Sequence, residues 1–448
     1  MKSNKKYTIY MLVFVAVLLV PFAGMLITGA SKSESSSSAK LPQLVMVSED
    51  ENKARINKDF LKQLGEYFEG HCALRQEMVT GYSYVTTKVF QTSSSKSVIY
   101  GKNGWMFYTD TLGDYTGSDV MSERQMFDAV RTLKLIDRYC KANNIRFYFV
   151  TAANKNSLYG ENMPYYYKKS DKPGNRVLLG EKIRAEGISY IDLYDAFKAE
   201  NKVLYHKTDS HWTNEGAALA ARVIHEATGQ MYVDRYNKAP YKVKKDFKGD
   251  LAAMMYPASV PLEEEIYYDG EFGFDYEGKV ESNFDNKIRT NGALGNNLMM
   301  YRDSFGSSLL PFMAESYTNA LFSRSLTIQV KDIESVKANV LIIEKAERFL
   351  PQLSENPPKL PATEIEGNPV GMRAMEGAKF KTSSFGGYTT ISGTLAEGSY
   401  GDNTKTYIRI DGKHWYEAYP FHKDGKECFQ LYIEEIPEGT KIEVFGAP

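Results

Sequence analysis

Cysteine is scarce in this chain of 448 residues, which contains only 3. Cys72, Cys140 and Cys428 form an odd and widely spaced set, which excludes a disulfide framework and a CxxC metal site. A disulfide between two of them stays open. Cys140 lies at helical spacing from Leu133 and Ile136, so we expect it to be buried as a small apolar side chain.

An excess of charge of one sign is also missing. The sequence has 55 Lys and Arg against 56 Asp and Glu, a net charge of −1, so nucleic acid is not an expected partner. The hydrophobic fraction of 43% and the charged fraction of 25% are usual for a folded protein of two or three domains. The 32 tyrosines suit strands and cores, or stacking on sugar rings.

Long apolar runs are absent except at the N-terminus, where Ile9–Ile27 is an uncharged run of 19 residues preceded by lysines. As a helix it would span roughly 28 Å, close to the hydrocarbon thickness of a bilayer. Residues 1–30 therefore predict a single-pass membrane anchor with the remaining chain outside the cytoplasm. The alternative is a signal peptide cleaved near 28–30, which would release a secreted protein. Residues 31–54 are expected to be a flexible Ser-rich tether.

Strands alternate with helices between residues 55 and 352. Apolar runs predict strands at 97–100, 105–108, 145–150, 188–193, 297–301, 320–322 and 340–343, and periodic patterns predict helices at 57–85, 121–143, 174–186, 213–227 and 305–316. This order predicts an α/β domain with a central parallel sheet, whose ligands bind beyond the carboxyl ends of the strands. The rhythm fails over 230–294, which we interpret as an insertion that walls the site.

The C-terminal part has a different pattern. Prolines crowd residues 353–376, which predicts a linker. Residues 377–448 contain six short strand patterns and predict a small β-sandwich-like domain. Its aromatic residues serve either as core or as a carbohydrate-binding face. The expected strands are 380–384, 388–394, 406–410, 415–421, 428–433 and 441–445.

Asp209, His211 and Ser304 are the parts of a nucleophilic triad. Asp209 lies two residues before His211 in an extended loop, so its carboxylate can reach a ring nitrogen and orient the imidazole. Ser304 follows an apolar strand and precedes a helix, whose backbone N–H groups can stabilise an oxyanion. Together they predict acyl transfer on a serine, with His211 as the base.

Three further residues follow strands of the same predicted sheet. Asn154 and Lys155 come after one strand and Arg324 after another, so we expect them at the same crevice as Ser304. Asn154 would donate to the acyl oxygen, and Arg324 would do the same or bind an anionic sugar. The alternatives are loop capping for Asn154 and a surface ion pair for Arg324.

A metal site is the main rival interpretation. His206, Asp209 and His211 form His-x-x-Asp-x-His, which can hold zinc. Because no clear fourth ligand follows and the serine would then have no role, we expect neither a metal nor another cofactor.

Several blocks, taken in order, resemble one family. The alginate O-acetylation type of SGNH-hydrolase-like protein, which includes the Gram-positive DHHW proteins, is similar to this chain over about residues 55–352. The matching blocks are 67–75, 101–108, 153–159 with Pro164, 208–216, 302–305 and 340–350.

This resemblance implies a circularly permuted SGNH-hydrolase-like fold, in which Asp209 and His211 precede Ser304. It adds Lys155, Tyr159 and Trp212, inside the matching blocks, as oxyanion or substrate-binding candidates. It also implies a polysaccharide acceptor and a membrane-bound O-acyltransferase partner that supplies the acyl group. The chain has Ser210 between the Asp and His, which leaves the functional pair intact. It has Arg302 where many serine blocks have glycine, and this difference puts the local oxyanion geometry in doubt.

The leading prediction is therefore an extracytoplasmic O-acetyltransferase acting on a cell-surface or secreted polysaccharide. Two alternatives stay open. An acetyl esterase of the same class would resolve the acyl-enzyme with water, and a non-catalytic polysaccharide-binding assembly subunit would keep only the fold.

Overall fold

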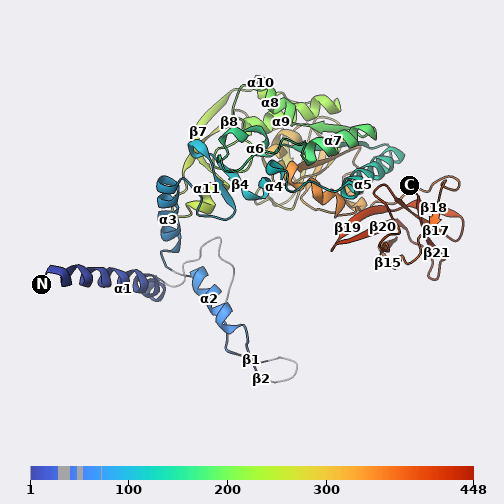
Figure 1. Cartoon of the computed structure of the whole chain (residues 1–448). Coiled ribbons are helices and arrows are strands. Elements are labelled where there is room, and N and C mark those ends of the chain that lie inside the picture. The colour runs from blue at the N-terminus through green and yellow to red at the C-terminus, as the bar shows by residue number, and fades with distance from the viewer. Residues whose placement is uncertain (1, 29–40, 48–53, 72, 448) are drawn as a thin grey trace. The chain divides into compact units, whose positions relative to one another are not determined.

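The structure is a computed structural model that describes residues 2–28, 41–47, 54–71 and 73–447 (Figure 1). Internal contacts divide the chain into two compact units. The first comprises Met1–Lys96 with Ala252–Pro261, and the second comprises Ser97–Leu251 with Leu262–Pro448.

The first unit is mostly helical. Its elements are α1 (Lys2–Thr28), β1 (Val45–Val47), β2 (Ala54–Ile56), α2 (Phe60–His71) and α3 (Arg75–Phe90). The single helix predicted over 57–85 is thus two helices, and Leu74 before α3 adopts the left-handed conformation, which ends helical geometry there. The segment 252–261 is tied to α3, because Tyr256 Oη lies 3.0 Å from Thr87 Oγ1 and Ala258 N lies 3.0 Å from Thr80 Oγ1.

Over the stretches that the structure describes, no helix meets the length and apolarity needed to cross a bilayer. The membrane anchor predicted from the sequence is thus not confirmed and stays a prediction. Most of the predicted tether, residues 31–40 and 48–53, lies outside the described residues, as does Cys72. Cys140 and Cys428 are free and buried, so the burial predicted for Cys140 is confirmed.

The second unit is built on a seven-stranded sheet of order β6-β5-β13-β11-β12-β10-β9. The first five strands in this order are parallel, as predicted, whereas β10 and β9 add to the edge antiparallel. Both edge strands come from the segment predicted as an insertion, and β10 shows the alternating burial of a strand with one face on the core. The strands are β5 (Arg146–Ala152), β6 (Tyr190–Asp192), β9 (Phe274–Tyr276), β10 (Lys287–Gly292), β11 (Asn297–Tyr301), β12 (Asn319–Ser323) and β13 (Val340–Ala346).

Helices cover both faces of this sheet. Leu298 and Met300 of β11 point into one buried cluster with α8, α9 and α12, while Met299 and Tyr301 point into another with α5, α7 and α13. This alternation follows from the two-residue period of a strand, and burial on both faces explains the continuous apolar runs. The helices are α5 (Glu123–Ala142), α7 (Asn175–Ala185), α8 (Tyr194–Ala199), α9 (Asn214–Thr228), α12 (Gly306–Ala314) and α13 (Val330–Ser335).

Short elements connect these layers and surround the carboxyl ends of the strands. The strands predicted at 97–100 and 105–108 are present and pair antiparallel as the hairpin β3–β4. The short elements are β3 (Val98–Tyr100), η1 (Lys102–Gly104), β4 (Met106–Tyr108), η2 (Thr109–Thr111), α4 (Leu112–Thr116), α6 (Lys155–Leu158), η3 (Gly160–Asn162), α10 (Arg235–Lys238), β7 (Tyr241–Lys248), α11 (Asp250–Met255), β8 (Leu262–Tyr268) and η4 (Glu347–Ser354).

The C-terminal residues form two four-stranded antiparallel sheets, of orders β14-β21-β17-β18 and β15-β16-β20-β19, that share one apolar core. The strand predicted at 415–421 is two strands, because the chain passes from one sheet to the other at Ala418, whose N–H bonds to Thr406 O. The strands are β14 (Arg373–Ala374), β15 (Lys379–Phe385), β16 (Tyr388–Thr394), β17 (Lys405–Ile410), β18 (His414–Glu417), β19 (Tyr419–Lys423), β20 (Lys426–Glu434) and β21 (Ile442–Ala447).

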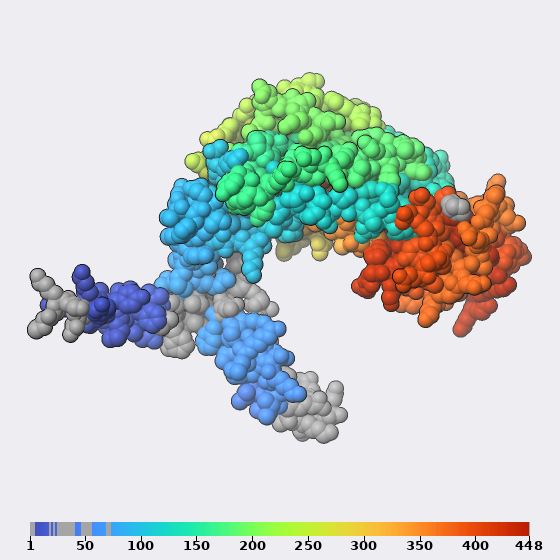
Figure 2. Space-filling model, viewed as in Figure 1, coloured from blue at the N-terminus to red at the C-terminus, as the bar shows by residue number. Residues whose placement is uncertain are grey.

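Buried ion pairs join this β-module to helix α5. Glu417, with a side chain 2% exposed, accepts from both Arg131 and Arg138. Arg124 Nη2 lies 2.6 Å from Glu427 Oε1. Figure 2 shows the orange and red residues of the module as a lobe against the teal residues of the α/β layers. The module is thus fixed to the sheet domain by specific charges.

Glu417→Gln should lower the free energy of unfolding by about 3 kcal/mol or more, because it leaves two partly buried arginines without their carboxylate. Glu123→Gln on the same helix is the control, since the pair of Glu123 with Lys182 is exposed and is expected to contribute less than about 1 kcal/mol. Urea denaturation measures both. Equal losses in the two variants would contradict the argument.

Candidate active site

Asp209 and His211 lie in the short Asp–His loop, residues 205–213, which connects the region after α8 to α9. An isolated bridge between Tyr205 and Trp212 closes the loop at its base. Thr213 ends it by capping α9, since Thr213 Oγ1 accepts from Gly216 N at 3.1 Å. The loop is therefore anchored at both ends, which fixes the direction of the side chains between them.

The three residues predicted as a triad lie within hydrogen-bond distance of one another. His211 Nδ1 is 2.7 Å from Asp209 Oδ1, and His211 Nε2 is 2.8 Å from Ser304 Oγ. The N–H of His211 also donates to Asp209 Oδ1 at 2.8 Å. Although burial acts to raise it, these interactions with His211 hold the pKa of Asp209 below its ordinary value. Asp209 thus stays ionised and orients the imidazole towards the serine.

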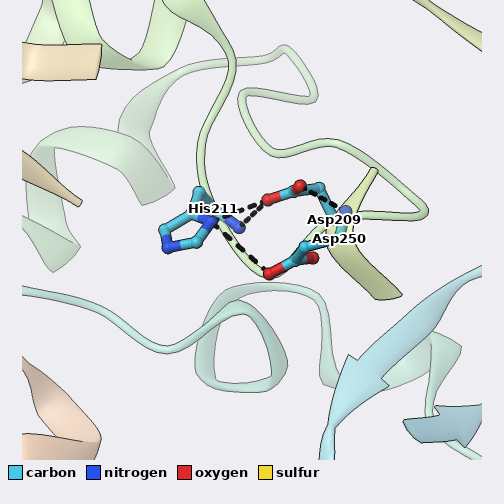
Figure 3. Close-up of side chains that lie close together, drawn as sticks. All are labelled: Asp209, His211 and Asp250. Atoms are coloured by element: carbon cyan, nitrogen blue, oxygen red, sulfur yellow. Dashed lines mark hydrogen bonds and ion pairs between the residues drawn. The ribbon is translucent and has the colours of Figure 1, made fainter. Parts of the chain in front are cut away.

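Asp250, the first residue of α11, is a second carboxylate beside the histidine that the sequence analysis missed. Its Oδ2 lies 3.8 Å from His211 Nδ1, and its N–H donates to Asp209 Oδ2 at 2.7 Å (Figure 3). Its carboxylate accepts from Ser210 N at 2.8 Å and from Ser210 Oγ at 2.6 Å. Burial, and then the negative charge of Asp209, raise the pKa of Asp250. Asp250 therefore fixes the middle residue of the Asp-Ser-His sequence.

Gly249, directly before Asp250, is the residue in the sequence that could have indicated the contact between Asp250 and the Asp–His loop. A Cβ at Gly249 would lie 2.2 Å from Thr208 O, so only glycine lets the two backbones approach this closely. The glycine brings the following Asp250 against the Asp–His loop.

The zinc ligand set considered from the sequence is not brought together. Among the described residues, the His, Asp, Glu and Cys atoms close enough to share one ion belong to Asp209, His211 and Asp250, within 4.8 Å. His206 is turned away from them. Its Nε2 lies 3.0 Å from Glu265 Oε2, and its ring stacks on Phe247 with a centroid distance of 3.7 Å.

Lys155 fixes the backbone of the Asp–His loop through hydrogen bonds. Its Nζ donates to the carbonyl oxygens of His206 at 3.0 Å, Lys207 at 3.0 Å and Asp209 at 2.5 Å. The residue is 3% exposed, and burial lowers the pKa of its ammonium to about 8. With all three donors directed at backbone, Lys155 shapes the loop, and its expected role at the crevice stays a prediction.

Two carboxylates of β8 hold the same loop from the other side. Glu263 accepts from Thr208 N at 2.5 Å and from Thr208 Oγ1, and Glu265 accepts from Asn214 N at 3.1 Å. Although burial acts to lower it, bonds to Glu263 and Glu265 raise the pKa of His206 to about 9. These glutamates come from the predicted insertion, so that segment supports the loop directly.

The turn that carries Ser304 is built around Asp303. Asp303 Oδ1 accepts from Phe305 N at 2.8 Å and its Oδ2 accepts from Ala346 N at 2.7 Å, while Asp303 N donates to Glu344 Oε2 at 3.0 Å. Burial, and then the charge of Asp303, raise the pKa of Glu344 well above its usual value. The turn is thus tied to the end of β13 through a buried carboxyl pair.

Asn154 and Arg324 make contacts other than those that motivated their prediction. Asn154 is fully buried; its Nδ2 donates to Asp114 Oδ2 at 2.9 Å and its Oδ1 accepts from Arg348 N at 3.3 Å. Arg324 Nη1 donates to Phe284 O at 3.0 Å. Their expected roles at an acyl oxygen or an anionic sugar stay predictions that none of these contacts supports.

Tyr159 and Trp212 pack around the base of the loop. Tyr159 Oη accepts from Leu204 N at 3.0 Å, and the indole N–H of Trp212 donates to Ser308 Oγ at 2.8 Å. Trp212 is 2% exposed and its ring lies edge-to-face with Phe305. Trp212 therefore positions the loop against α12, and Tyr159 binds the chain just before the loop. The expected contact of both residues with substrate stays a prediction.

The charge on His206 should make stability fall with rising pH. Its folded pKa of about 9 exceeds the unfolded value of 6.5, so its contribution is complete below pH 6.5 and lost as the pH rises through 9. The difference corresponds to at most about 3 kcal/mol. Urea denaturation at a series of pH values from about 6 to about 9.5 measures the free energy of unfolding. This free energy should decline with rising pH in the native protein and should not show this decline in His206→Gln.

His225 provides the matched control for this experiment. It is buried without a partner among the described residues, and burial lowers its pKa to about 3. Its contribution to stability is therefore lost only as the pH falls below 6.5, and His225→Gln should keep the alkaline decline. An unchanged alkaline decline in His206→Gln would show that the ion pairs of His206 do not stabilise the loop.

Comparison with known proteins finds one family that matches part of this chain. Residues 98–266 match the family described as SGNH hydrolase-like domain, acetyltransferase AlgX; the match includes the Asp–His loop and ends before Ser304. No curated protein matches the sequence.

Solved structures that are similar to this chain come from several bacteria. PatB1 of Bacillus cereus with a sulfonyl adduct is 16% identical, covering 56% of this chain and 94% of that chain, with a TM-score of 0.45. A DHHW family protein of Eubacterium siraeum is 14% identical over 56% and 91%, with a TM-score of 0.42. AlgX of Pseudomonas aeruginosa is 15% identical over 82% and 97%, with a TM-score of 0.39. The family match thus covers part of the chain: residues 98–266 are similar to the SGNH hydrolase-like domain of the acetyltransferase AlgX.

Proposed function

We propose that this protein is an extracytoplasmic O-acetyltransferase that acts on polysaccharide hydroxyls through an acyl-enzyme on Ser304. The observation that carries the proposal is the continuous line of hydrogen bonds from Asp209 through His211 to Ser304 Oγ, with lengths of 2.7 and 2.8 Å. A serine hydroxyl becomes an effective nucleophile when a neighbouring base takes its proton, and this geometry supplies the base and its orienting carboxylate.

The first half-reaction loads the serine. Ser304 Oγ forms a bond to the acetyl carbonyl carbon, its proton passes to His211 Nε2, and the carbonyl π electrons move onto oxygen. Collapse of this intermediate breaks the bond to the donor oxygen, which leaves with the proton from His211. Asp209 stabilises the imidazolium that forms between these steps.

The second half-reaction repeats these steps with a sugar hydroxyl as nucleophile. The hydroxyl gives its proton to His211 Nε2 and attacks the acyl carbon, and Ser304 leaves and regains the proton. Water in place of the sugar would make the protein an acetyl esterase. The acetyltransferase family of residues 98–266 favours transfer.

The location and partners of the reaction belong to the same proposal. Lysines before the uncharged run Ile9–Ile27 favour an N-terminal membrane anchor with the catalytic domain outside the cytoplasm, where surface polysaccharides lie. A donor inside the cell would then require a membrane-bound O-acyltransferase to carry acyl groups across the bilayer.

Replacement of the nucleophile tests the proposal. Incubated with a small activated acetyl ester, the native protein should gain one acetyl group by intact-protein mass spectrometry, and Ser304→Ala should gain none. Turnover of the ester should fall by about 10⁴-fold or more, since removal of a triad nucleophile commonly costs this much. Ser325→Ala, a serine past the end of β12 that donates to Thr327 O, is the control and should label normally. Acetylation of Ser304→Ala to the native level would refute the acyl-enzyme.

The acceptor is tested with the same protein. Neutral and uronate-containing oligosaccharides are supplied with the ester, and O-acetylated sugar and free acetate are measured together. Transfer supports the acetyltransferase, and release of acetate alone with every acceptor would identify an esterase.

A further inference from the structure

The order of the strands marks one position in the sheet as a crevice. After β11 the chain adds β12 on one side, and β13 then returns to the other side of β11. The connections after β11 and β13 therefore diverge, and ligands of parallel α/β sheets bind at such a switch point, beyond the carboxyl ends of the strands. Ser304 follows β11, and Arg348 follows β13 at the start of η4.

Arg348 lies one aromatic ring away from the triad. Its guanidinium carbon is 5.3 Å from the centre of the Phe305 ring, and that ring is 4.9 Å from the ring of His211. The same guanidinium is 5.8 Å from the ring of Tyr108. Burial and Asp110 raise the pKa of Tyr108, the charge of Arg348 acts to lower it, and Asp250 acts to raise it. Tyr108 is therefore near enough to both Arg348 and Asp250 for their charges to act on it.

Arg348 has no anionic partner within the described part of the chain. Its Nε is buried without a hydrogen bond, and its side chain forms no ion pair there. The neighbouring Glu347 is engaged elsewhere, with Ser157 Oγ at 2.7 Å and Asn154 N at 2.9 Å. Aromatic rings cover the faces of a guanidinium and leave its N–H groups free to bind an oxygen.

Two neutral groups that could bind an oxyanion already have other partners. In a strand–turn–helix serine site, the N–H of the residue after the nucleophile normally binds the oxyanion. Here Phe305 N donates to Asp303 Oδ1 at 2.8 Å, and Asn154 Nδ2 donates to Asp114 at 2.9 Å. Neither group is therefore available in this arrangement to a charge that develops on the acyl oxygen.

We propose that Arg348 binds the acyl carbonyl oxygen and stabilises the oxyanion formed when Ser304 attacks. This assignment rests on the proposed acyl-enzyme and adds to it the group that receives the carbonyl electrons. A guanidinium in an aromatic, partly buried environment is fixed in position before the reaction and is little screened by water, which makes it an effective partner for developing charge.

The test uses a small neutral acetyl ester, which carries no sugar and no charge. Arg348→Met should lower kcat by about 10²-fold or more with little change in KM, because an oxyanion donor acts mainly in the transition state. Added guanidinium chloride should restore part of the rate in Arg348→Ala. Arg348→Lys should retain an intermediate rate, since an ammonium keeps the charge and loses the planar fork.

Arg184→Met is the matched control. Arg184 also stacks on an aromatic ring, with its guanidinium carbon 4.7 Å from the centre of Tyr190, but it lies on α7 and is exposed. Its kcat should stay within about twofold of the native value, as is usual for surface substitutions away from a site. Circular dichroism and the thermal midpoint establish that each variant is folded.

Three outcomes separate this inference from the proposed function. Normal kcat on the ester in folded Arg348→Met and Arg348→Lys, with Ser304 still acetylated, would overturn the inference and leave the acyl-enzyme intact. A normal rate on the ester combined with a raised KM only for a uronate-containing acceptor would assign Arg348 to an acceptor carboxylate and overturn it as well. Failure of the native protein to acetylate Ser304 at all would instead refute the proposed function.

Discussion

The geometry of the site depends on buried charges that hold the Asp–His loop from both sides. Lys155 donates to three backbone carbonyl oxygens of the loop. On β8, Glu263 accepts from loop N–H groups and Glu265 binds His206. A loop of nine residues without regular structure would otherwise sample many conformations. Fixing it has an entropic cost of about 1–2 kcal/mol for each residue. Charge-assisted hydrogen bonds are strong enough to offset this cost and are directional enough to select one conformation.

The nucleophile has a separate support. Asp303 and Glu344 tie the serine turn to β13, and none of the groups that hold the Asp–His loop is part of this arrangement. The two halves meet through the 2.8 Å contact between His211 and Ser304. Because a misplacement of about 1 Å can cost about 10²-fold in rate, each half requires its own rigid framework. The neighbouring strands β11 and β13 supply the framework of the serine turn. Lys155, which follows β5, and the carboxylates of β8 supply that of the Asp–His loop.

The sequence predicted the parts of this site whose signals are local. Asp209 and His211 are two residues apart, and Ser304 directly follows an apolar strand, so spacing and position were sufficient. Asp250 and Glu263 were not predicted, because each acts on a partner about 40 to 55 residues away through a tertiary contact. The α/β alternation was likewise readable, whereas the antiparallel edge strands and the division at Ala418 are set by packing between elements.

Residues at strand ends show the limit of positional reasoning. Asn154, Lys155 and Arg324 were predicted at the crevice because the ends of parallel strands share one edge of the sheet. These residues do follow the carboxyl ends of parallel strands, but the direction of each side chain depends on the polar groups around it. Asn154 and Lys155 turn inward because the half-buried carboxylate of Asp114 and a set of backbone carbonyls accept their hydrogen bonds.

This difference in partners separates Lys155 from Arg348, which has no carboxylate partner among the residues that the structure describes. Lys155 directs all three donors at backbone carbonyl oxygens, which solvate its charge within the fold, and burial lowers the pKa of its ammonium to about 8. Arg348 has aromatic rings on its faces and a buried Nε without an acceptor. A guanidinium does not lose its proton at physiological pH, so its unsatisfied charge persists in the resting protein. In the proposed reaction this charge is matched only when negative charge develops on the acyl oxygen, which is the electrostatic condition for catalysis by transition-state stabilisation.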